Sequence, residues 1–432
     1  MASSLESITP ELQSLVMSYI PRQTDLKNLC LTSKQLRSIA VPRLYRAVKL
    51  EYDAVAKHPG LFQQDHPGHE LIRYLDFRIL HWLEKRERTP AAGAIKYALQ
   101  LMPSAILKRL TTPHIVPLDV DFLRTISSQQ RNLQELSLGP IMGDASAAEL
   151  QPSNWLTKIN GLELTTYIGG EKNLEFYSRV IRQVKRLNYL YIRTTSIIEE
   201  IDDEASEWIV RDIEETDDLV FRKLFSQSSE HGAAYRQIQL HNLLVQDVFL
   251  GQADSILFQG IRFELLRYLT IYYCSRADLF LRPLAEYFRK VGHVSLRGLR
   301  LSNGDMLSWI TAIEDLLKSF SGLQFLLIRE HCPDPHFNLN SLRTHASSLQ
   351  HLYIGRGKDD VRRRKAQWRG SSQDWLRLLY THNFEIRQLA IALPMIDVSR
   401  MDVSRLAPFL KSLVSLASSP FRHVEKSSVN AT

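Results

Sequence analysis

The sequence predicts an α/β protein in which three short N-terminal helices precede a solenoid of short parallel strands joined by helices. Three observations support this fold. Three helical patterns occupy the first fifty residues, one apolar pattern returns eleven times from residue 70 onward, and helix-spaced apolar residues lie between its copies. Alternating strands and helices are typical of parallel sheets, and a pattern that returns along the chain indicates a repeat protein.

The first helix is predicted by apolar residues that share one side of it. Leu12, Leu15, Val16 and Tyr19 stand at positions i, i+3, i+4 and i+7, which is the spacing of one helical face. Thr9 precedes them and is suited to the N-cap, because its hydroxyl can accept a hydrogen bond from a free backbone N–H.

Two further helices follow within the same segment. The second is expected to begin at Thr24, and Pro42 is expected to end the third, because proline lacks a backbone N–H. Thr32 and Gln35 have the spacing of a capping box at the start of the third helix. The apolar residues of these two helices are Leu26, Leu29, Cys30, Leu36, Ile39 and Ala40.

So small a helical unit has too little interior to be stable alone. Units below about 40 residues rarely fold without a cross-link, a metal or a partner. The segment offers no disulfide and no metal-ligand pattern. We therefore expect its apolar surface to be completed by another protein, although an ordinary helical cap on the repeats is the alternative.

The same residues resemble the F-box, a helical motif whose family members bind the adaptor Skp1. The motif elements are Ile8-x-Pro10-Glu11-Leu12, Asp25-Leu26-x-x-Leu29-Cys30, Ser33-Lys34-x-Leu36-Arg37 and Pro42-x-Leu44-Tyr45-Arg46. An apolar strand pattern follows them, as in many fungal F-box proteins. The resemblance implies that the contacts to Skp1 are made by Ile8, Pro10, Glu11, Leu12, Val16, Leu26, Leu29 and Leu36.

The repeated pattern reads apolar, two others, apolar, one other, and then apolar or threonine. Its last two apolar positions are two residues apart, so both side chains point to the same side of a strand. The eleven copies are Ile72/Leu75/Phe77, Leu107/Leu110/Thr112, Leu133/Leu136/Leu138, Ile159/Leu162/Leu164, Leu187/Leu190/Ile192, Tyr235/Ile238/Leu240, Leu266/Leu269/Ile271, Val291/Val294/Leu296, Leu323/Leu326/Ile328, Leu349/Leu352/Ile354 and Ile386/Leu389/Ile391.

The spacing of the copies is similar to that of degenerate leucine-rich repeats. Most copies follow one another at the long end of that period, and residues 174–184, 279–288 and 309–320 between them have helical spacing. Stacked copies bury a core that no single copy could bury. Cys274 stands where such repeats often carry a capping residue. A non-repeating α/β domain is the alternative.

Charge runs interrupt the repeats at two places. Residues 198–218 are strongly acidic, and residues 356–370 contain the basic run Arg362-Arg363-Arg364-Lys365. Both are expected to be solvated insertions, because like charges repel one another. A contact with a charged partner is the alternative for each, and the basic run also fits an import signal.

We expect the substrate-binding surface on the concave side of the solenoid, next to the buried positions of each strand. Tyrosine, arginine and other aromatic residues dominate there, and such side chains are enriched at interface hot spots. Packing of these residues against insertions is the alternative. The predicted substrate-binding residues are Tyr189, Tyr191, Arg193, Tyr268, Tyr272, His293, Arg297, Phe325, Arg329 and Tyr353.

The sequence carries no convincing catalytic signature. It has no phosphate loop, no HExxH, no GxSxG and no paired CxxC. We therefore expect neither an enzyme nor a cofactor or metal. Three cysteines at unrelated spacings favour a reducing compartment, and the chain lacks a long apolar run or a signal-like N-terminus. An intracellular location, cytoplasmic or nuclear, is expected.

Taken with the resemblance, these features predict the substrate-recognition adaptor of an SCF (Skp1–cullin–F-box) ubiquitin ligase. The expected domains are an F-box-like segment (residues 1–50), a repeat domain (residues 51–419) and a disordered tail (residues 420–432). Skp1, and through it a cullin-RING ligase, are the expected partners, together with a protein substrate. The alternatives are a scaffold without a role in ubiquitination, and a nucleic-acid-associated repeat protein, for which the chain has no long basic stripe.

Overall fold

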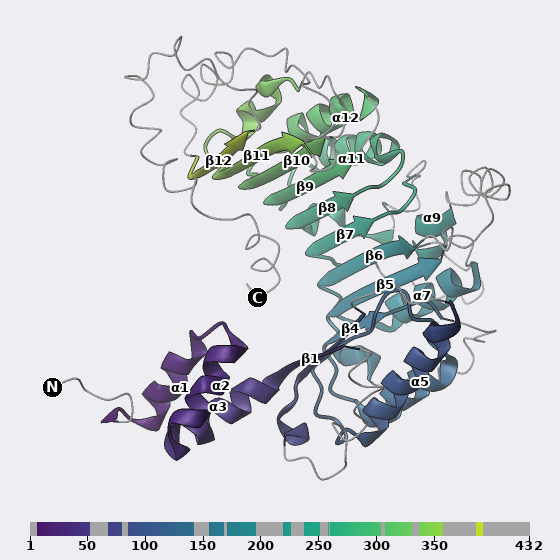
Figure 1. Cartoon of the computed structure of the whole chain (residues 1–432). Helices are drawn as coiled ribbons and strands as arrows, with labels where there is room; N and C mark the ends of the chain where they lie inside the picture. The colour runs from purple at the N-terminus through teal and green to yellow at the C-terminus, as the bar shows by residue number, and fades with distance from the viewer. Residues whose placement is uncertain are drawn as a thin grey trace. The chain divides into compact units, whose positions relative to one another are not determined.

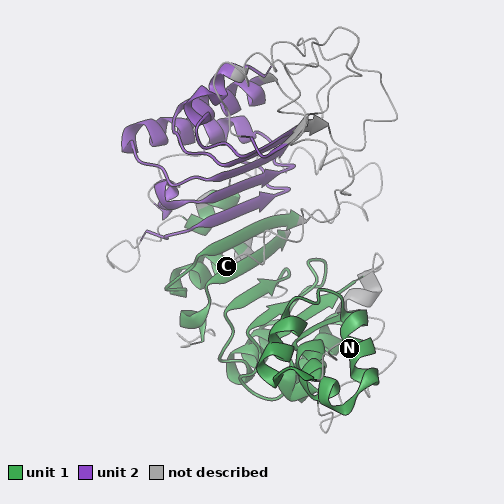
Figure 2. Ribbon diagram, turned by 90° about the vertical axis from the view of Figure 1, so that its left-hand side faces the viewer, with its two compact units in different colours: residues 1–234 green, residues 235–432 purple. Residues whose placement is uncertain are grey.

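The chain divides into two compact units, residues 1–234 and 235–432 (Figure 2). The computed structural model describes residues 7–51, 68–79, 85–141, 155–167, 171–195, 219–225, 237–250, 258, 260–303, 307–330, 337–356 and 386–391. The predicted acidic insertion, most of the basic insertion and the C-terminal tail lie outside these residues. None of the described helices is both long and apolar enough to cross a bilayer.

Unit 1 begins with the three predicted helices and continues as an α/β repeat (Figure 1). Its strands are β1 (Ala47–Glu51), β2 (Tyr74–Arg78), β3 (Arg109–Thr111), β4 (Glu135–Leu138), β5 (Gly161–Tyr167) and β6 (Tyr189–Thr195). Its helices are α1 (Pro10–Ser18), α2 (Gln23–Thr32), α3 (Lys34–Arg46), α5 (Lys85–Leu101), α6 (Val120–Gln129), α7 (Glu171–Gln183) and α9 (Leu219–Phe225), with short 3₁₀ turns η3 (His69–Leu71) and η5 (Leu156–Lys158).

Unit 2 repeats the same arrangement. Its strands are β7 (Asn242–Gln246), β8 (Tyr268–Tyr272), β9 (Gly298–Asn303), β10 (Phe325–Glu330), β11 (His351–Arg356) and β12 (Gln388–Ile391). Its helices are α11 (Ala277–Val291) and α12 (Leu307–Lys318), with 3₁₀ segments η8 (Phe263–Leu265) and η9 (Leu339–His345). Within each unit the strands are parallel and follow one another in chain order.

The strands are joined by one hydrogen-bonding motif that returns along each sheet. In unit 1 the Gln134 carbonyl accepts hydrogen bonds from two consecutive N–H groups, those of Asn160 and Gly161, at 2.8 and 3.1 Å. In unit 2 the Arg267 carbonyl accepts from Arg297 and Gly298 at 2.8 and 2.9 Å. Because the residue before the strand makes this contact in both units, the strands that share it start in the same register.

Alternation along the strands separates a buried face from an open face. In β8, Leu269 and Ile271 are buried beneath the helical layer that contains Phe280 and Phe288 of α11, whereas Tyr268 is half exposed. We call the side of each sheet that lies opposite its helices the open face (Figure 2). Each unit therefore has an α/β, solenoid-like organisation, as the sequence predicted.

Two of the eleven predicted strand positions are shifted by five residues. The sixth and eighth copies were placed at Ile238/Leu240 and Val294/Leu296, whereas the strands carry Leu243/Val245 in β7 and Leu299/Leu301 in β9. The pattern fits twice in each place, because the last apolar residue of the false copy is the first of the true one. Strand pairing decides between the two readings, since Leu243 and Val245 pair with β8, and Leu299 and Leu301 pair with β8 and β10, whereas Ile238 and Val294 are only partly buried.

Two local predictions about the third helix were wrong. Its N-cap is Ser33, whose hydroxyl accepts a hydrogen bond from the Leu36 N–H at 3.1 Å, while the Thr32 hydroxyl donates to the Leu29 carbonyl. Pro42 does not end the helix, which continues to Arg46 and leads directly into β1. The predicted domain boundary at residue 50 therefore falls within a strand that pairs with β2.

Several polar side chains are buried where they hold neighbouring repeats together. The Thr112 hydroxyl donates to the Ser137 carbonyl at 2.9 Å and accepts from the Gly139 N–H at 3.1 Å. The Cys274 thiol lies 3.2 Å from the Tyr272 carbonyl and 3.6 Å from the Val245 carbonyl. Cys274 is therefore buried just after β8, where its thiol contacts carbonyl groups of β7 and β8.

His345 plays a similar part at the helical layer of unit 2. Its Nδ1 accepts a hydrogen bond from the Leu323 N–H at 3.3 Å, and its Nε2 lies 3.0 Å from the Leu317 carbonyl. One acceptor and one donor nitrogen are found together only in the neutral ring. Burial lowers the pKa of His345 to about 4, although its hydrogen bond to Leu317 favours the charged form.

We predict that His345 makes unit 2 less stable in acid. The neutral His345 ring contributes to the free energy of unfolding fully above its ordinary pKa of 6.5. This contribution is lost as the pH falls towards about 4, at about 1.4 kcal/mol per pH unit. In urea unfolding, the stability difference between the wild-type chain and His345→Gln should shrink over that range, since glutamine keeps a donor and an acceptor but does not titrate. A difference that stays constant with pH would contradict this role.

Candidate functional site

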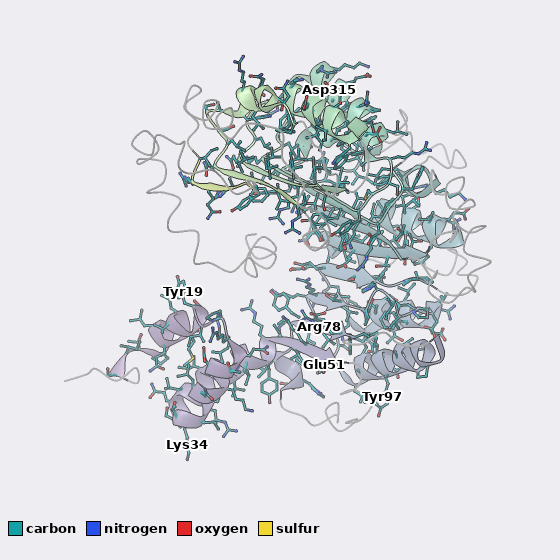
Figure 3. The ribbon with its side chains drawn as sticks, turned by 45° about the horizontal axis from the view of Figure 1, so that its top comes forward. Tyr19, Lys34, Glu51, Arg78, Tyr97 and Asp315 are labelled. Carbon is teal, nitrogen blue, oxygen red and sulfur yellow. The ribbon has the colours of Figure 1, made fainter. Side chains whose placement is uncertain are left out.

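The apolar side of α1 is exposed, although the three-helix segment to which it belongs has only a small core. Leu12, Leu15, Val16 and Tyr19 are 50%, 53%, 43% and 78% exposed. We call these four residues the α1 face. Tyr19 stands on the outside of the three-helix segment, residues 10–46 (Figure 3). Large apolar side chains grouped in this way are typical of interaction sites.

The opposite side of α1 supplies the interior of the three-helix segment. Met17 packs with Leu26, Leu36 and Ala40, and these four are its only fully buried apolar residues. A hydrogen bond from α3 also holds the C-terminal end of α1. Arg43 donates to the Ser18 carbonyl at 2.6 Å. The three helices therefore have a small core of their own, which holds α1 in place without covering its apolar face.

This core changes the role of two predicted contact residues. Leu26 and Leu36 are 5% and 6% exposed, so we assign them to the interior of the segment and not to its contact surface. Leu29 is half-buried against the same core. The remaining predicted contact residues lie on α1 or just before it, where Pro10, Glu11, Leu12 and Val16 are exposed and Ile8 is partly exposed.

Leu15 and Tyr19 were missing from the predicted contact set and belong to the α1 face. The sequence did place both on the apolar stripe through their i, i+3, i+4 spacing. Leu31 of α2 is also 79% exposed. The sequence could not show which side of each helix faces the small core, because apolar residues occur on more than one side.

On the open face of unit 1, aromatic and charged residues stand side by side. Tyr189 and Tyr191 of β6 lie opposite Gly161 and Glu163 of β5 in the parallel register. Burial raises the pKa of Glu163, although the positive charges of Arg109 and Arg193 and a hydrogen bond from Ser137 favour its ionised form. The predicted residues Tyr189, Tyr191 and Arg193 are thus brought together with a carboxyl group.

Basic and acidic side chains are paired on the open face of unit 1. Arg78 lies 2.8 Å from Asp76, and Arg109 lies 3.4 Å from Glu135. Burial and the nearby Arg193 lower the pKa of His114 to about 4, so its ring is neutral at physiological pH. Figure 3 shows Arg78 at the end of its strand close to Glu51, its register partner. The positive charges of Arg78 and Arg109 are therefore balanced by carboxylates on the same face.

The open face of unit 2 is built around Phe325. The Arg300 guanidinium lies 4.9 Å from the centre of the Phe325 ring, in cation–π geometry. The His351 and Tyr353 rings lie 6.1 and 5.6 Å from the same ring. Gln388 completes the cluster, because its Oε1 lies 3.0 Å from His351 Nδ1 and accepts a hydrogen bond from the Tyr353 hydroxyl.

Tyr268 extends this aromatic surface across the neighbouring strand. Its ring lies directly over Gly298, where a Cβ atom would come 2.8 Å from Tyr268 Cε1. Only glycine leaves room for the ring at this position. Tyr272 and Arg329 lie on the open face at the far ends of β8 and β10 and are both partly exposed.

Two predicted substrate-binding residues are not strand residues, because the eighth repeat was placed five residues too early. His293 lies in the segment between α11 and β9, and Arg297 directly precedes β9. Both are exposed. The open-face residue that was missed is Arg300, and the signal for it was present in the second fit of the pattern, at Leu296, Leu299 and Leu301.

Nothing in the described residues points to chemistry at either surface. No group of three or more histidine, cysteine or acidic residues in the described ranges could hold a metal ion. Burial raises the pKa of the Cys274 thiol to about 12, which makes it a poor nucleophile.

Comparison of the chain with models of known protein families and with curated proteins finds no match.

The contact between Tyr268 and Gly298 predicts an unusual mutational effect. Gly298→Ala should destabilise the protein by about 1–3 kcal/mol, because the methyl group overlaps the tyrosine ring. In a Tyr268→Ala background the same change should be neutral or stabilising, since alanine in an unstrained strand restricts the unfolded chain more than glycine does. Urea unfolding of the four variants measures this coupling, and an equal loss in both backgrounds would show that the ring does not occupy this position.

Proposed function

We propose that this protein is the substrate-recognition adaptor of an SCF-type ubiquitin ligase. In this proposal the three-helix segment is an F-box that binds Skp1, and the repeats that follow it bind a protein substrate. The chain itself makes and breaks no bond. Its contribution is to raise the effective concentration of the substrate's lysines near the transfer machinery.

The observation that carries the proposal is the exposed α1 face. A segment with four fully buried apolar residues leaves four large apolar side chains in water. Burying a fully exposed side chain of this size contributes roughly 1.5–3 kcal/mol, so side chains that are about half exposed gain roughly half of that each. A partner that covers the α1 face therefore gains binding energy, and the segment gains the interior that its own chain does not supply.

The positions of the motif elements provide further support. The first element, Ile8 to Leu12, spans the start of α1, and the second, Asp25 to Cys30, lies within α2. The third, Ser33 to Arg37, contains the observed N-cap of α3. Each conspicuous element of the resemblance therefore coincides with a helix or a helix start.

Co-purification with Skp1 tests the proposal. The full chain should retain Skp1, whereas Leu12→Ser combined with Tyr19→Ser should lose most of it, because both side chains are exposed and contribute to the α1 face. Two truncated hot-spot contacts of this kind commonly cost about 2 kcal/mol or more each, which corresponds to a loss of affinity of about 700-fold or more.

The matched control is Tyr97→Ser on α5, which removes another large side chain that is 52% exposed in unit 1 (Figure 3). Its recovery of Skp1 should equal that of the wild-type chain. Leu36→Ala serves as a second comparison, because it should lower stability through loss of core packing by about 2–5 kcal/mol. Undiminished Skp1 binding by the Leu12/Tyr19 variant would refute the adaptor proposal.

A further inference from the structure

Five arginines lie on the open face of unit 2 or at the starts of its strands, and none of them is matched by an acidic residue. Arg267, Arg297 and Arg387 are exposed and directly precede β8, β9 and β12, while Arg300 and Arg329 are partly exposed within β9 and β10. None of the five forms a salt bridge within the described ranges. The surface therefore carries an uncompensated positive charge.

The two units differ in the acidic residues at their open-face strand positions, although unit 1 also has basic residues, Arg46, Arg73 and Lys108, directly before three of its strands. On the open face of unit 1, Arg78 and Arg109 have Asp76 and Glu135 as partners. In unit 2, the described open-face positions of β7 to β12, and the residue before each of these strands, include no aspartate or glutamate. The described salt bridges of unit 2 join Arg262 to Glu264 and Lys318 to Glu314.

Like charges held together on one surface repel one another, and a bound anionic partner removes this repulsion. Arginine is well suited to that role, because its planar guanidinium binds carboxylates through two parallel hydrogen bonds. Arg300 is oriented by its contact with the Phe325 ring. Its side chain therefore has less freedom to lose when a ligand binds.

The aromatic residues of this face favour a peptide over a nucleic acid. Proteins that bind single-stranded nucleic acid need free ring faces on which bases can stack. Here the Phe325 ring is surrounded by Arg300, His351 and Tyr353, and the Tyr268 ring lies over Gly298. These rings form an apolar wall against which side chains of a peptide can pack, and they would have to move to accept a base.

We propose that the open face of unit 2 binds an extended segment of the substrate that is rich in aspartate and glutamate. This inference rests on the proposed function and names the chemical class of the substrate. The arginines extend from β8 to β12, which is four strand spacings of about 4.8 Å, or about 19 Å. An extended chain of about six residues covers that distance. Acidic side chains of such a segment contact the arginines, and its apolar side chains contact Phe325 and Tyr353.

Fluorescence anisotropy with defined probes tests the inference on the full chain. The first probe is a labelled peptide in which aspartate and glutamate alternate with leucine, and the second has the same sequence with asparagine and glutamine in place of the acids. The acidic peptide should bind and the neutral one should not. Arg300→Glu combined with Arg329→Glu should weaken binding of the acidic peptide by at least about tenfold, because hydrogen bonds to charged groups contribute about 1.5–3 kcal/mol each.

The control variant carries the same change in net charge on the helical side of the unit. Arg282 and Lys290 are exposed residues of α11, and Arg282→Glu combined with Lys290→Glu should bind the acidic peptide like the wild-type chain. If the first variant fails to fold in a melting experiment, Arg267→Glu combined with Arg297→Glu replaces it, because both residues are exposed and precede the strands.

Three results would overturn the inference. The first is equal affinity of the open-face and α11 variants for the acidic peptide. The second is tighter binding of an oligothymidylate, lost in the open-face variants, which would favour nucleic acid. The third is binding of a peptide only when serines in it are phosphorylated. Co-purification with Skp1 is measured in parallel, so that retained Skp1 with no peptide binding rejects this inference alone, while lost Skp1 rejects the adaptor proposal.

Discussion

The structure depends on the burial of a few apolar side chains from every repeat beneath its helices. A single repeat could not exclude water from them, but stacked repeats form a continuous interior. Leu269 and Ile271, or Leu326 and Ile328, are fully buried because the adjacent strands continue the same apolar layer. Since side chains alternate along a strand, this burial also determines which residues remain on the open face. The surface that is available for binding is thus a consequence of the core.

The three-helix segment illustrates the opposite situation. Its interior consists of four buried apolar side chains, and among the described residues the outer side of α1 stays exposed at Leu12 and Tyr19. Two hydrogen bonds, from Arg43 to Ser18 and from Gln23 to Ala47, help to hold the helices and their exit into β1. A small, well-defined core below an uncovered apolar face is an arrangement suited to completion by another protein.

The open faces of the two units show how one repeat architecture supports different surfaces. Unit 1 places carboxyl groups beside Arg78 and Arg109, and burial keeps Glu163 and His114 closer to neutrality. Unit 2 combines arginines with aromatic rings and leaves the charge unbalanced. The backbone arrangement is the same in both, so the difference arises only from the residues at the open positions.

Much of the fold could be predicted because its signals are local. The spacing of Leu187, Leu190 and Ile192 gives a strand with one buried side, and the helical spacing of residues 279–288 gives α11. The errors occurred where two local readings were possible. The pattern fits both at Ile238 and five residues later, and only packing against the neighbouring strand β8 selects the second. For the same reason Arg297 was placed on a strand and Arg300 was missed.

By itself the sequence determined the type and order of the elements, the repeat, and the composition of the strand faces, because these depend on side-chain spacing and backbone preference. Only the tertiary structure decided which leucines of the helical segment are interior, which arginines have acidic partners, and which ring lies over Gly298. These properties depend on residues that are far apart in the chain and meet only when the repeats stack.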